Sequence, residues 1–267
     1  MKNKIFIPFI CLTIVLALLP CLPVSADNGG LVGALATSDF QDNWEDDLEG
    51  FINAVDGYAN WNIGFTLSLY PYPSWFEEDG TPYSDDDYAD KTELTLIEGH
   101  GGFDYDISIP SFWTYIDLEG NGTLSAEENN ISLGYESESG DQNIWFFAIS
   151  CSILRDNYNC YADWLSILNG THMMLGFKSD GGIHDHDLRE LADRFMSEVG
   201  GSYSYQKIQD AFFSTYVSRD MQVHYDNICR ILAENSSVAD VDYLFSYVAE
   251  TTVDATKYII TCGPAPA

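Results

Sequence analysis

Short apolar runs alternate with amphipathic stretches along most of the chain. Runs rich in branched and aromatic side chains predict strands, and they occupy residues 31–36, 63–69, 94–98, 144–149, 172–177 and 258–261. Apolar residues at helical spacing predict helices, and they occupy residues 42–55, 161–168, 187–199 and 205–219. Residues 228–233 and 238–248 fit neither period clearly. Strands that alternate with helices indicate an α/β domain with a mainly parallel sheet and helices on both faces.

The amino-terminal segment has the pattern of a targeting sequence. Two lysines precede a long apolar run that ends in small residues, which is the arrangement of a secretory signal peptide. We therefore expect residues 1–26 to be a signal peptide and residues 27–267 to form a secreted or cell-surface domain. A lipoprotein anchored at Cys21 and an uncleaved amino-terminal anchor are the alternatives. No later apolar run reaches the ~18 residues of a spanning helix, so we expect no stable membrane span after cleavage.

The net charge of the chain limits the classes of partner that it is expected to bind. Asp and Glu number 42 against 11 Lys and Arg, which gives a formal net charge of −31. So acidic a surface repels nucleic acid and anionic lipid, and it suits calcium or basic partners. We therefore expect no nucleic-acid partner.

Four cysteines lie outside the predicted signal peptide: Cys151, Cys160, Cys229 and Cys262. In an exported protein, four cysteines can form two disulfides in three possible pairings. A disulfide is therefore the structural alternative to any chemistry at Cys151.

Two of the predicted strands end at residues with reactive side chains. His100 follows the strand at 94–98, and Cys151 follows the strand at 144–149. If these strands are parallel neighbours, both side chains lie at the sheet edge where open α/β sheets place their sites. An imidazole beside a thiol favours the nucleophilic thiolate and can protonate a leaving amine. We therefore predict a catalytic dyad of His100 and Cys151.

The glycine after the histidine completes the predicted site. A glycine lets the backbone approach a substrate closely, and the N–H of Gly101 is suited to stabilise an oxyanion.

These motifs resemble those of the caspase-like cysteine peptidases, the group that holds caspases, gingipains, clostripain, legumain and separase. In that group one strand ends in His-Gly, here His100 and Gly101, and another ends in a cysteine, here Cys151. The separation of 51 residues, 151 minus 100, is similar to the roughly 50 residues between the caspase histidine and cysteine. The resemblance implies a caspase-hemoglobinase-type α/β fold over about residues 31–260, with Cys151 as nucleophile and His100 as acid/base.

The resemblance does not extend to the substrate. The caspase sequence Gln-Ala-Cys-x-Gly is replaced here by Ser150-Cys151-Ser152-Ile153, and nothing after it resembles a known substrate pocket. The chain is also similar to uncharacterised secreted archaeal proteins that carry the same two motifs.

The segment between the two motifs contains a candidate calcium loop at residues 117–128. Its spacing is that of the twelve-residue EF-hand loop, with oxygen ligands from Asp117, Glu119, Asn121, Thr123 (through its carbonyl), Ser125 and Glu128. Gly122 stands where the loop turns sharply, and Leu124 stands where an apolar residue is usual. The match resembles EF-hand and dockerin loops, although Asp or Asn is usual in place of Glu119. A short entering helix at 111–116 is then expected, and a plain turn before a helix capped by Ser125 and Glu128 is the alternative.

Other polar clusters have simpler interpretations. His184 and His186 have a spacing that suits a transition metal, but a solvated loop or a mobile rim of the site also explains them. The acidic loop at 85–90 is a solvated loop, a calcium site or a rim for a basic substrate. His172 and His224 lie in apolar surroundings and are expected in the core.

Two functions follow from these patterns. The first is a secreted, calcium-stabilised cysteine peptidase that acts on a peptide or protein substrate, with the acidic surface suggesting a basic residue before the scissile bond. The alternative is a non-catalytic, calcium-binding exported domain that binds a partner. The state and reactivity of the Cys151 thiol distinguish the two.

Overall fold

The fold was described from a computed structural model of the chain. The described residues are 30–37, 44–56, 61–65, 71–77, 85, 88–106, 111–118, 121–127, 131–134, 143–156, 160–178, 187–195, 197–199, 202–204, 207–216, 228–233, 242 and 258–262. The predicted signal peptide, His184, His186 and His224 lie outside them. No helix in the described part of the chain is long and apolar enough to cross a membrane.

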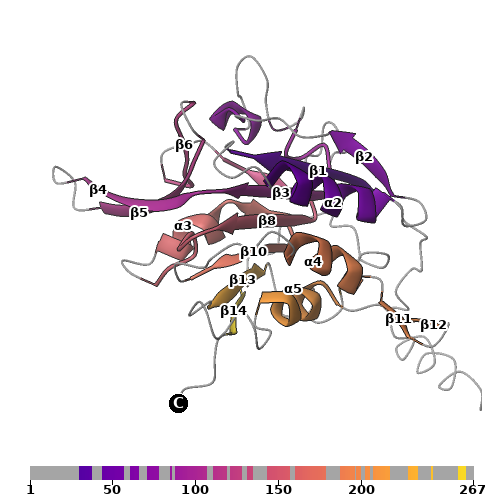
Figure 1. The fold of residues 1–267 in the computed structure, drawn as a ribbon. Helices are drawn as coiled ribbons and strands as arrows, with labels where there is room; N and C mark the ends of the chain where they lie inside the picture. The colour runs from indigo at the N-terminus through magenta and orange to yellow at the C-terminus, as the bar shows by residue number, and fades with distance from the viewer. Residues whose placement is uncertain are drawn as a thin grey trace, which may run out of the picture.

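The centre of the structure is a seven-stranded sheet with the order β14-β13-β10-β8-β3-β1-β2 (Figure 1). Its strands are β1 (Leu31–Ala36), β2 (Asn62–Phe65), β3 (Leu94–Gly99), β8 (Trp145–Ser150), β10 (Met173–Phe177), β13 (Cys229–Ala233) and β14 (Tyr258–Cys262). Neighbours from β2 to β10 are parallel, whereas β13 is antiparallel to β10 and β14 is antiparallel to β13. The predicted α/β class with a mainly parallel sheet is therefore confirmed, with an antiparallel edge added.

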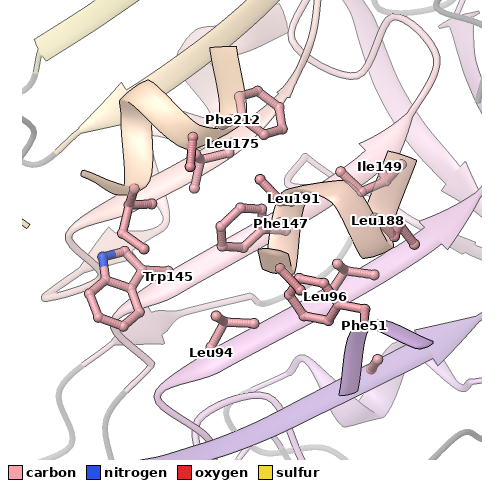
Figure 2. Packing of buried hydrophobic residues seen from close by; sticks show 14 of the residues in the cluster. Phe51, Leu94, Leu96, Trp145, Phe147, Ile149, Leu175, Leu188, Leu191 and Phe212 are labelled. Atoms are coloured by element: carbon pink, nitrogen blue, oxygen red, sulfur yellow. The ribbon is translucent and has the colours of Figure 1, made fainter. Parts of the chain in front are cut away.

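Helices cover one face of this sheet. In Figure 1, α2 (Trp44–Asp56), α4 (Asp187–Phe195) and α5 (Ile208–Tyr216) lie side by side across it. Their apolar side chains pack on the inward side chains of the strands to form what we call the helix-side core (Figure 2). Its largest members include Phe51, Trp145, Phe147, Phe212 and Tyr216, all essentially inaccessible to solvent. Burial of this kind is the main stabilising contribution to such a domain.

The opposite face has a different cover. There α3 (Cys160–Ser166) and the short 3-10 helix η1 (Pro73–Trp75) pack together with strands from the segment between β3 and β8. Those strands are β4 (Gly101–Asp106), β5 (Ser111–Asp117), β6 (Thr123–Leu124) and β7 (Leu133–Gly134), the last paired with β9 (Leu168–Asn169). Within the described residues, the cover of this face is therefore mainly strands and irregular chain, not the layer of helices that the sequence predicted.

Two predicted helices differ from the structure. The helix expected at 187–199 ends at Phe195, and Ser197–Val199 forms β11, paired with β12 (Ser202–Ser204). The sequence between these two strands is Gly-Gly, a two-residue signature of a β-hairpin. The helix expected at 111–116 is instead β5, because its aromatic and β-branched residues favour an extended backbone.

A buried polar network fixes the amino-terminal ends of the central strands. The Nδ1 atom of His172 lies 2.6 Å from Oδ2 of Asp242, which also accepts a 3.0 Å hydrogen bond from Trp145 Nε1. The backbone carbonyl of Asp242 accepts from the N–H of Ile208 at the start of α5. His172 is fully buried, so its predicted place in the core is confirmed, and Asp242 provides the partner that its buried Nδ1 atom requires.

Candidate functional site

The two reactive residues predicted from the sequence follow neighbouring strands in equal register. β3 and β8 are parallel, and Gly99 is paired with Ser150. Neighbouring strands lie about 4.8 Å apart, so the backbones of His100 and Cys151 leave the sheet side by side. The expectation that these two strands are parallel neighbours is therefore confirmed, and it places both positions at one carboxyl edge of the sheet.

The exposure and oxidation state of these residues suit chemistry. His100 is exposed and Cys151 is partly exposed, whereas Cys160 and Cys229 are buried. All three cysteines carry thiols. The Cys151–Cys160 disulfide that would favour a purely structural role is therefore not formed.

Glycines around His100 are required by packing. A Cβ atom on Gly99 would stand 2.3 Å from Oγ1 of Thr37, and one on Gly101 would stand 2.0 Å from the carbonyl oxygen of Cys151. Both distances are far below van der Waals contact, so a larger residue at Gly99 would have to displace the Thr37 side chain, and one at Gly101 would have to displace backbone. The sequence suggested that Gly101 lets the backbone approach a substrate; the structure adds that it lets the backbone approach Cys151 itself.

The chain after Cys151 forms a firmly held loop. Ser152 has a φ of +54°, a left-handed conformation that is uncommon for a residue other than glycine. Its carbonyl accepts from the N–H of Arg155, and the N–H of Leu154 donates to the carbonyl of Phe177 at the end of β10. The carbonyl of Ile153 accepts a 2.7 Å hydrogen bond from Thr114 Oγ1. Each of these bonds restricts the position of Cys151.

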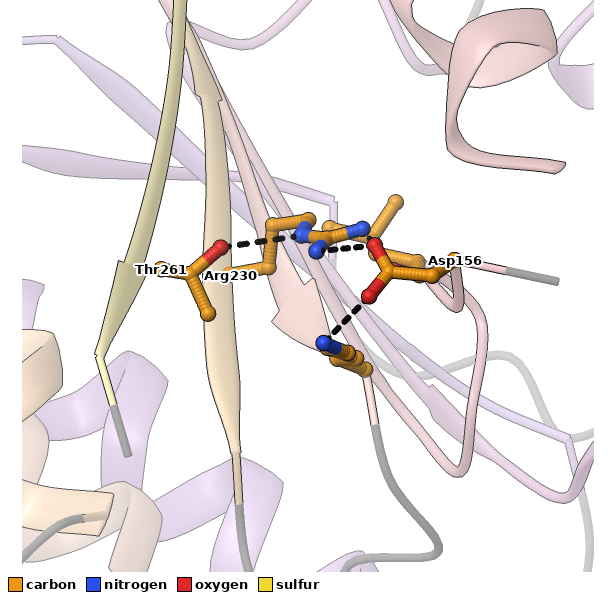
Figure 3. A network of polar contacts seen from close by, with 5 residues as sticks. Asp156, Arg230 and Thr261 are labelled. Carbon is orange, nitrogen blue, oxygen red and sulfur yellow. Dashed lines mark hydrogen bonds and ion pairs between the residues drawn. The ribbon is translucent and has the colours of Figure 1, made fainter. Parts of the chain in front are cut away.

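Arg230 anchors the same loop from the other side (Figure 3). This almost fully buried side chain donates from Nη1 to the carbonyl of Leu154 at 2.8 Å and from Nε to Thr261 Oγ1 at 3.2 Å. Its Nη2 atom lies 2.5 Å from Oδ1 of Asp156, whose other oxygen pairs with Lys178. Burial alone raises the pKa of Asp156, but the hydrogen bonds from Lys178 and Arg230 outweigh it, so the pKa lies below its usual value.

The candidate calcium loop is directly connected to His100. β4 and β5 form a hairpin that continues beyond the end of β3 (Figure 1), with Gly101 paired with Ile116. At its base, the N–H of Asp117 donates to the carbonyl of His100 at 2.8 Å. The first predicted calcium ligand and the predicted acid/base are thus one hydrogen bond apart.

The geometry of the loop agrees with the sequence in part. Gly122 has a φ of +105°, as its place in the sharp turn predicted, and Leu124 and Ser125 are fully buried. The Oγ atom of Ser125 accepts from the N–H of Glu127 at 3.2 Å. Asn121 directs its side-chain amide toward the carbonyl of Pro71, at 3.3 Å.

The entry into the loop and its ligand set differ from an EF-hand. The entering element is β5, which pairs with β6 and closes the loop as a hairpin. The prediction of a short entering helix is therefore wrong. Glu119 and Glu128 lie outside the described residues. Among the residues that the structure does describe, no three His, Cys, Asp or Glu side chains gather as a metal site.

With this geometry in place, comparison with known proteins identifies the family. Residues 40–250 match the family described as "Domain of unknown function (DUF6345)". The chain belongs to the DUF6345 family. It is also similar to an uncharacterized protein of Archaeoglobus fulgidus, with 38% identity over 229 residues. The aligned region covers 84% of this chain and 82% of that protein. No solved structure matches the chain.

Within this DUF6345 domain, an acidic side chain of the candidate calcium loop, Glu127, lies near an acidic side chain of α3, Asp163. Burial raises the pKa of the Asp163 carboxyl to about 6, and the negative charge of Glu127 adds to the shift. The same two carboxylates, after burial, contribute to raising the pKa of the Cys160 thiol. A cation near this pair would relieve the repulsion between its charges.

Several residues that shape the site were not predicted from the sequence. Thr114 accepts from Trp164 Nε1 at 2.9 Å while it holds the loop after Cys151, and Arg230 holds that loop from β13. The one available signal for Arg230 was a charged residue inside an apolar run, which in a buried strand requires a partner.

The close approach of Gly101 to Cys151 yields a mutational prediction. We expect Gly101→Ala to destabilise the fold by about 1–3 kcal/mol, because the added methyl must displace backbone, and to slow alkylation of Cys151. Gly50→Ala is the matched control, since a Cβ there meets no atom within 4 Å and the change inside α2 is neutral or slightly stabilising. Urea unfolding and thiol labelling measure both effects; equal behaviour of the two variants would contradict the packing argument.

The raised pKa of Asp163 yields a prediction for pH. The folded state holds this proton more tightly than the unfolded state does. The contribution of this carboxyl group to the stability of the fold is therefore greatest below about pH 4, and it falls as the pH rises from 3.8 to about 6. After allowance for solvent screening, we expect a loss of about 1 kcal/mol. Asp163→Asn should remove this slope, whereas Asp193→Asn, on the exposed side of α4, should keep it. Unfolding measured between pH 4 and 7 decides the point.

Proposed function

We propose that the protein is a secreted cysteine peptidase of the caspase-like type, in which Cys151 is the nucleophile and His100 is the acid/base. One observation carries the proposal: β3 and β8 are parallel neighbours with Gly99 opposite Ser150, so the imidazole and the thiol originate from adjacent positions of one sheet edge. The exposure of His100 and the partial exposure of Cys151 support it.

The fold supports the same assignment. β1 and β3 are neighbours whose chains leave in opposite directions across the sheet, to β2 on one side and β8 on the other. Such a switch in strand order is where open α/β sheets bind ligands, outside the carboxyl ends of the strands. A caspase-hemoglobinase-type domain is therefore the finer fold that we propose for this sheet.

The proposed reaction proceeds through an acyl-enzyme. The Cys151 thiolate attacks the peptide carbonyl carbon, and backbone N–H groups, that of Gly101 among them, stabilise the oxyanion. His100 then donates a proton to the leaving amine, which departs and leaves a thioester on Cys151. Water, deprotonated by His100, attacks the thioester, releases the carboxylic acid and restores the thiol.

Calcium is the cofactor that we propose for the loop at 117–128. The left-handed Gly122, the buried Leu124 and the Asp117 N–H bond to the His100 carbonyl support this role. An ion held there would restrain the base of the β4–β5 hairpin, and therefore the backbone of His100. The ion is not needed to bring His100 and Cys151 to the same edge, because β3 and β8 pair through their own backbones.

The reactivity of Cys151 tests the dyad. We expect iodoacetamide to label Cys151 near pH 6, and His100→Ala to reduce the labelling rate by at least about tenfold, because the thiolate then loses its neighbouring imidazolium. Cys160 is the internal control: burial, followed by the charge of Asp163, raises its pKa, so it should stay unlabelled. Cleavage of a peptide library, measured by mass spectrometry, should disappear in Cys151→Ala and persist in Cys160→Ala.

A contrary result would leave the non-catalytic alternative. If Cys151 reacts at the rate of an ordinary thiol and His100→Ala changes nothing, the dyad does not exist. The favoured function is then an exported calcium-binding domain that recognises a partner.

Calorimetric titration tests the calcium loop separately. We expect a calcium-dependent heat that Asp117→Ala abolishes, and a melting temperature that rises with calcium concentration because the ion binds the folded state. Asp193→Ala, which also removes one carboxylate but from α4, should bind like the native protein. Absence of heat in the native protein would end the calcium proposal without affecting the dyad.

A further inference from the structure

Basic side chains are scarce in this chain, yet three of them gather at one end of the central sheet. The whole sequence has 11 Lys and Arg against 42 Asp and Glu. Arg155 lies in the loop after β8, Lys178 directly follows β10, and Arg230 lies in β13 opposite Gly176, near the end of β10. This is the edge at which Cys151 lies.

Two of these cations share one carboxylate, and the third stacks on an aromatic ring. Asp156 pairs with Lys178 through one oxygen and with Arg230 through the other. The Arg155 side chain stacks on the ring of Phe103, whose centroid lies 4.4 Å from the guanidinium carbon, and its positive charge also acts to lower the pKa of the Cys160 thiol, against the rise that burial causes. Its Nε atom is buried without a hydrogen-bond partner among those residues. Carboxylates are in large excess in this chain. A shortage of acidic partners therefore does not explain why this arginine stacks on an aromatic ring.

The position of this arginine is fixed relative to both members of the dyad. Phe103 lies in β4, three residues after His100, and it is opposite Thr114 in the hairpin. Thr114 bonds the carbonyl of Ile153, and the N–H of Arg155 bonds the carbonyl of Ser152. Because Arg155 is four residues after Cys151, the two Cα atoms are at most about 14 Å apart, and the turn between them makes the separation shorter.

The contact also leaves the charge available. Phe103 is 56% exposed, so the stacked pair lies at the surface of the hairpin. An arginine stacked on an aromatic ring keeps its hydrogen-bond donors in the plane of the guanidinium. Because Nε of Arg155 is buried, the two Nη groups are the donors that match a carboxylate.

We propose that Arg155, held against Phe103, is a specificity-determining residue that binds a carboxylate on the ligand of this site. The carboxylate is supplied by an acidic side chain of a peptide or by a peptide's free carboxyl end. This inference rests on the proposed peptidase function for the identity of the ligand, but not for the binding of an anion next to Cys151.

The local charge thus points the opposite way from the overall charge. The acidic surface suggested a basic residue before the scissile bond, because a net charge of −31 attracts cations. A bound group, however, responds chiefly to charges within a Debye length, about 8 Å at physiological salt. Within that range Arg155 supplies a positive charge in the loop that follows Cys151, held against the ring of Phe103.

Two small reagents test the subsite without any need for turnover. Iodoacetate and iodoacetamide both form a bond from the Cys151 sulfur to carbon with release of iodide, and they differ in one carboxylate. The measured quantity is the ratio of their alkylation rates at Cys151, divided by the same ratio for glutathione at the same pH and salt. We expect Arg155→Gln to lower this ratio about fivefold, the effect of one nearby charge, and Arg155→Lys to retain part of it.

Lys91 provides the matched control. It is exposed and precedes β3 at the opposite end of the strand from His100, so Lys91→Gln removes the same charge at a distance and should leave the ratio unchanged. Equal ratios in the native protein and Arg155→Gln, with both folded by circular dichroism, would overturn the proposal. So would an equal fall in Lys91→Gln, because the effect would then be one of net charge.

The outcome for the subsite is separable from the outcome for the dyad. Failure of His100→Ala to slow either reagent contradicts the peptidase proposal, while the ratio still reports on Arg155. Complete protection of Cys151 from both reagents in the folded protein overturns both proposals.

Peptides then distinguish the two sources of the carboxylate. Protection of Cys151 from iodoacetamide is compared for an amidated peptide with Glu, its amidated Gln counterpart, and the Gln peptide with a free carboxyl end. Protection by the first alone assigns an acidic side chain, and protection by the third alone assigns a chain end. Equal protection by all three, unchanged in Arg155→Gln, overturns the assignment of a carboxylate.

Discussion

The arrangement of the site depends on the pairing of β3 with β8. Both strands are buried on both faces, and their side chains alternate between two cores. Leu96 and Phe147 belong to the helix-side core, whereas Ile97 and Ala148 belong to the core on the opposite face of the sheet. A shift of one residue in either strand would move every side chain to the wrong core. The hydrophobic effect therefore fixes the register, and the register brings His100 and Cys151 to the same level.

The segment between these strands braces the edge that they form. Thr114 in β5 connects the loop after Cys151 to Trp164 in α3, while the backbone of Asp117 bonds that of His100. Arg230 closes the arrangement from β13. The bonds made by Thr114 and Arg230 are buried, so the loss of either would be costly. The two positions of the proposed dyad are thereby held by bonds from other elements.

Much of this could be predicted from the sequence because the signals are local. The strands around His100 and Cys151 are continuous apolar runs, and buried parallel strands have that composition. The hairpin at 101–117 was not predicted. Its second strand, β5, was expected to be a short helix, because the sequence alone does not reveal that this segment pairs with β4. The ties made by Thr114 and Arg230 join residues far apart in the chain, and no periodic pattern records such a contact. Overall charge and the charge of one loop favour different ligands, because composition has no spatial resolution.

The long separation between the paired strands has a kinetic consequence. Parallel strands whose partners are distant in sequence close large loops, and such non-local contacts form late in folding. Residues 100 and 151 therefore become neighbours only when the intervening chain has collapsed onto the sheet. In a nascent or partly denatured molecule the imidazole and the thiol are apart, so the proposed chemistry of the pair requires the tertiary structure.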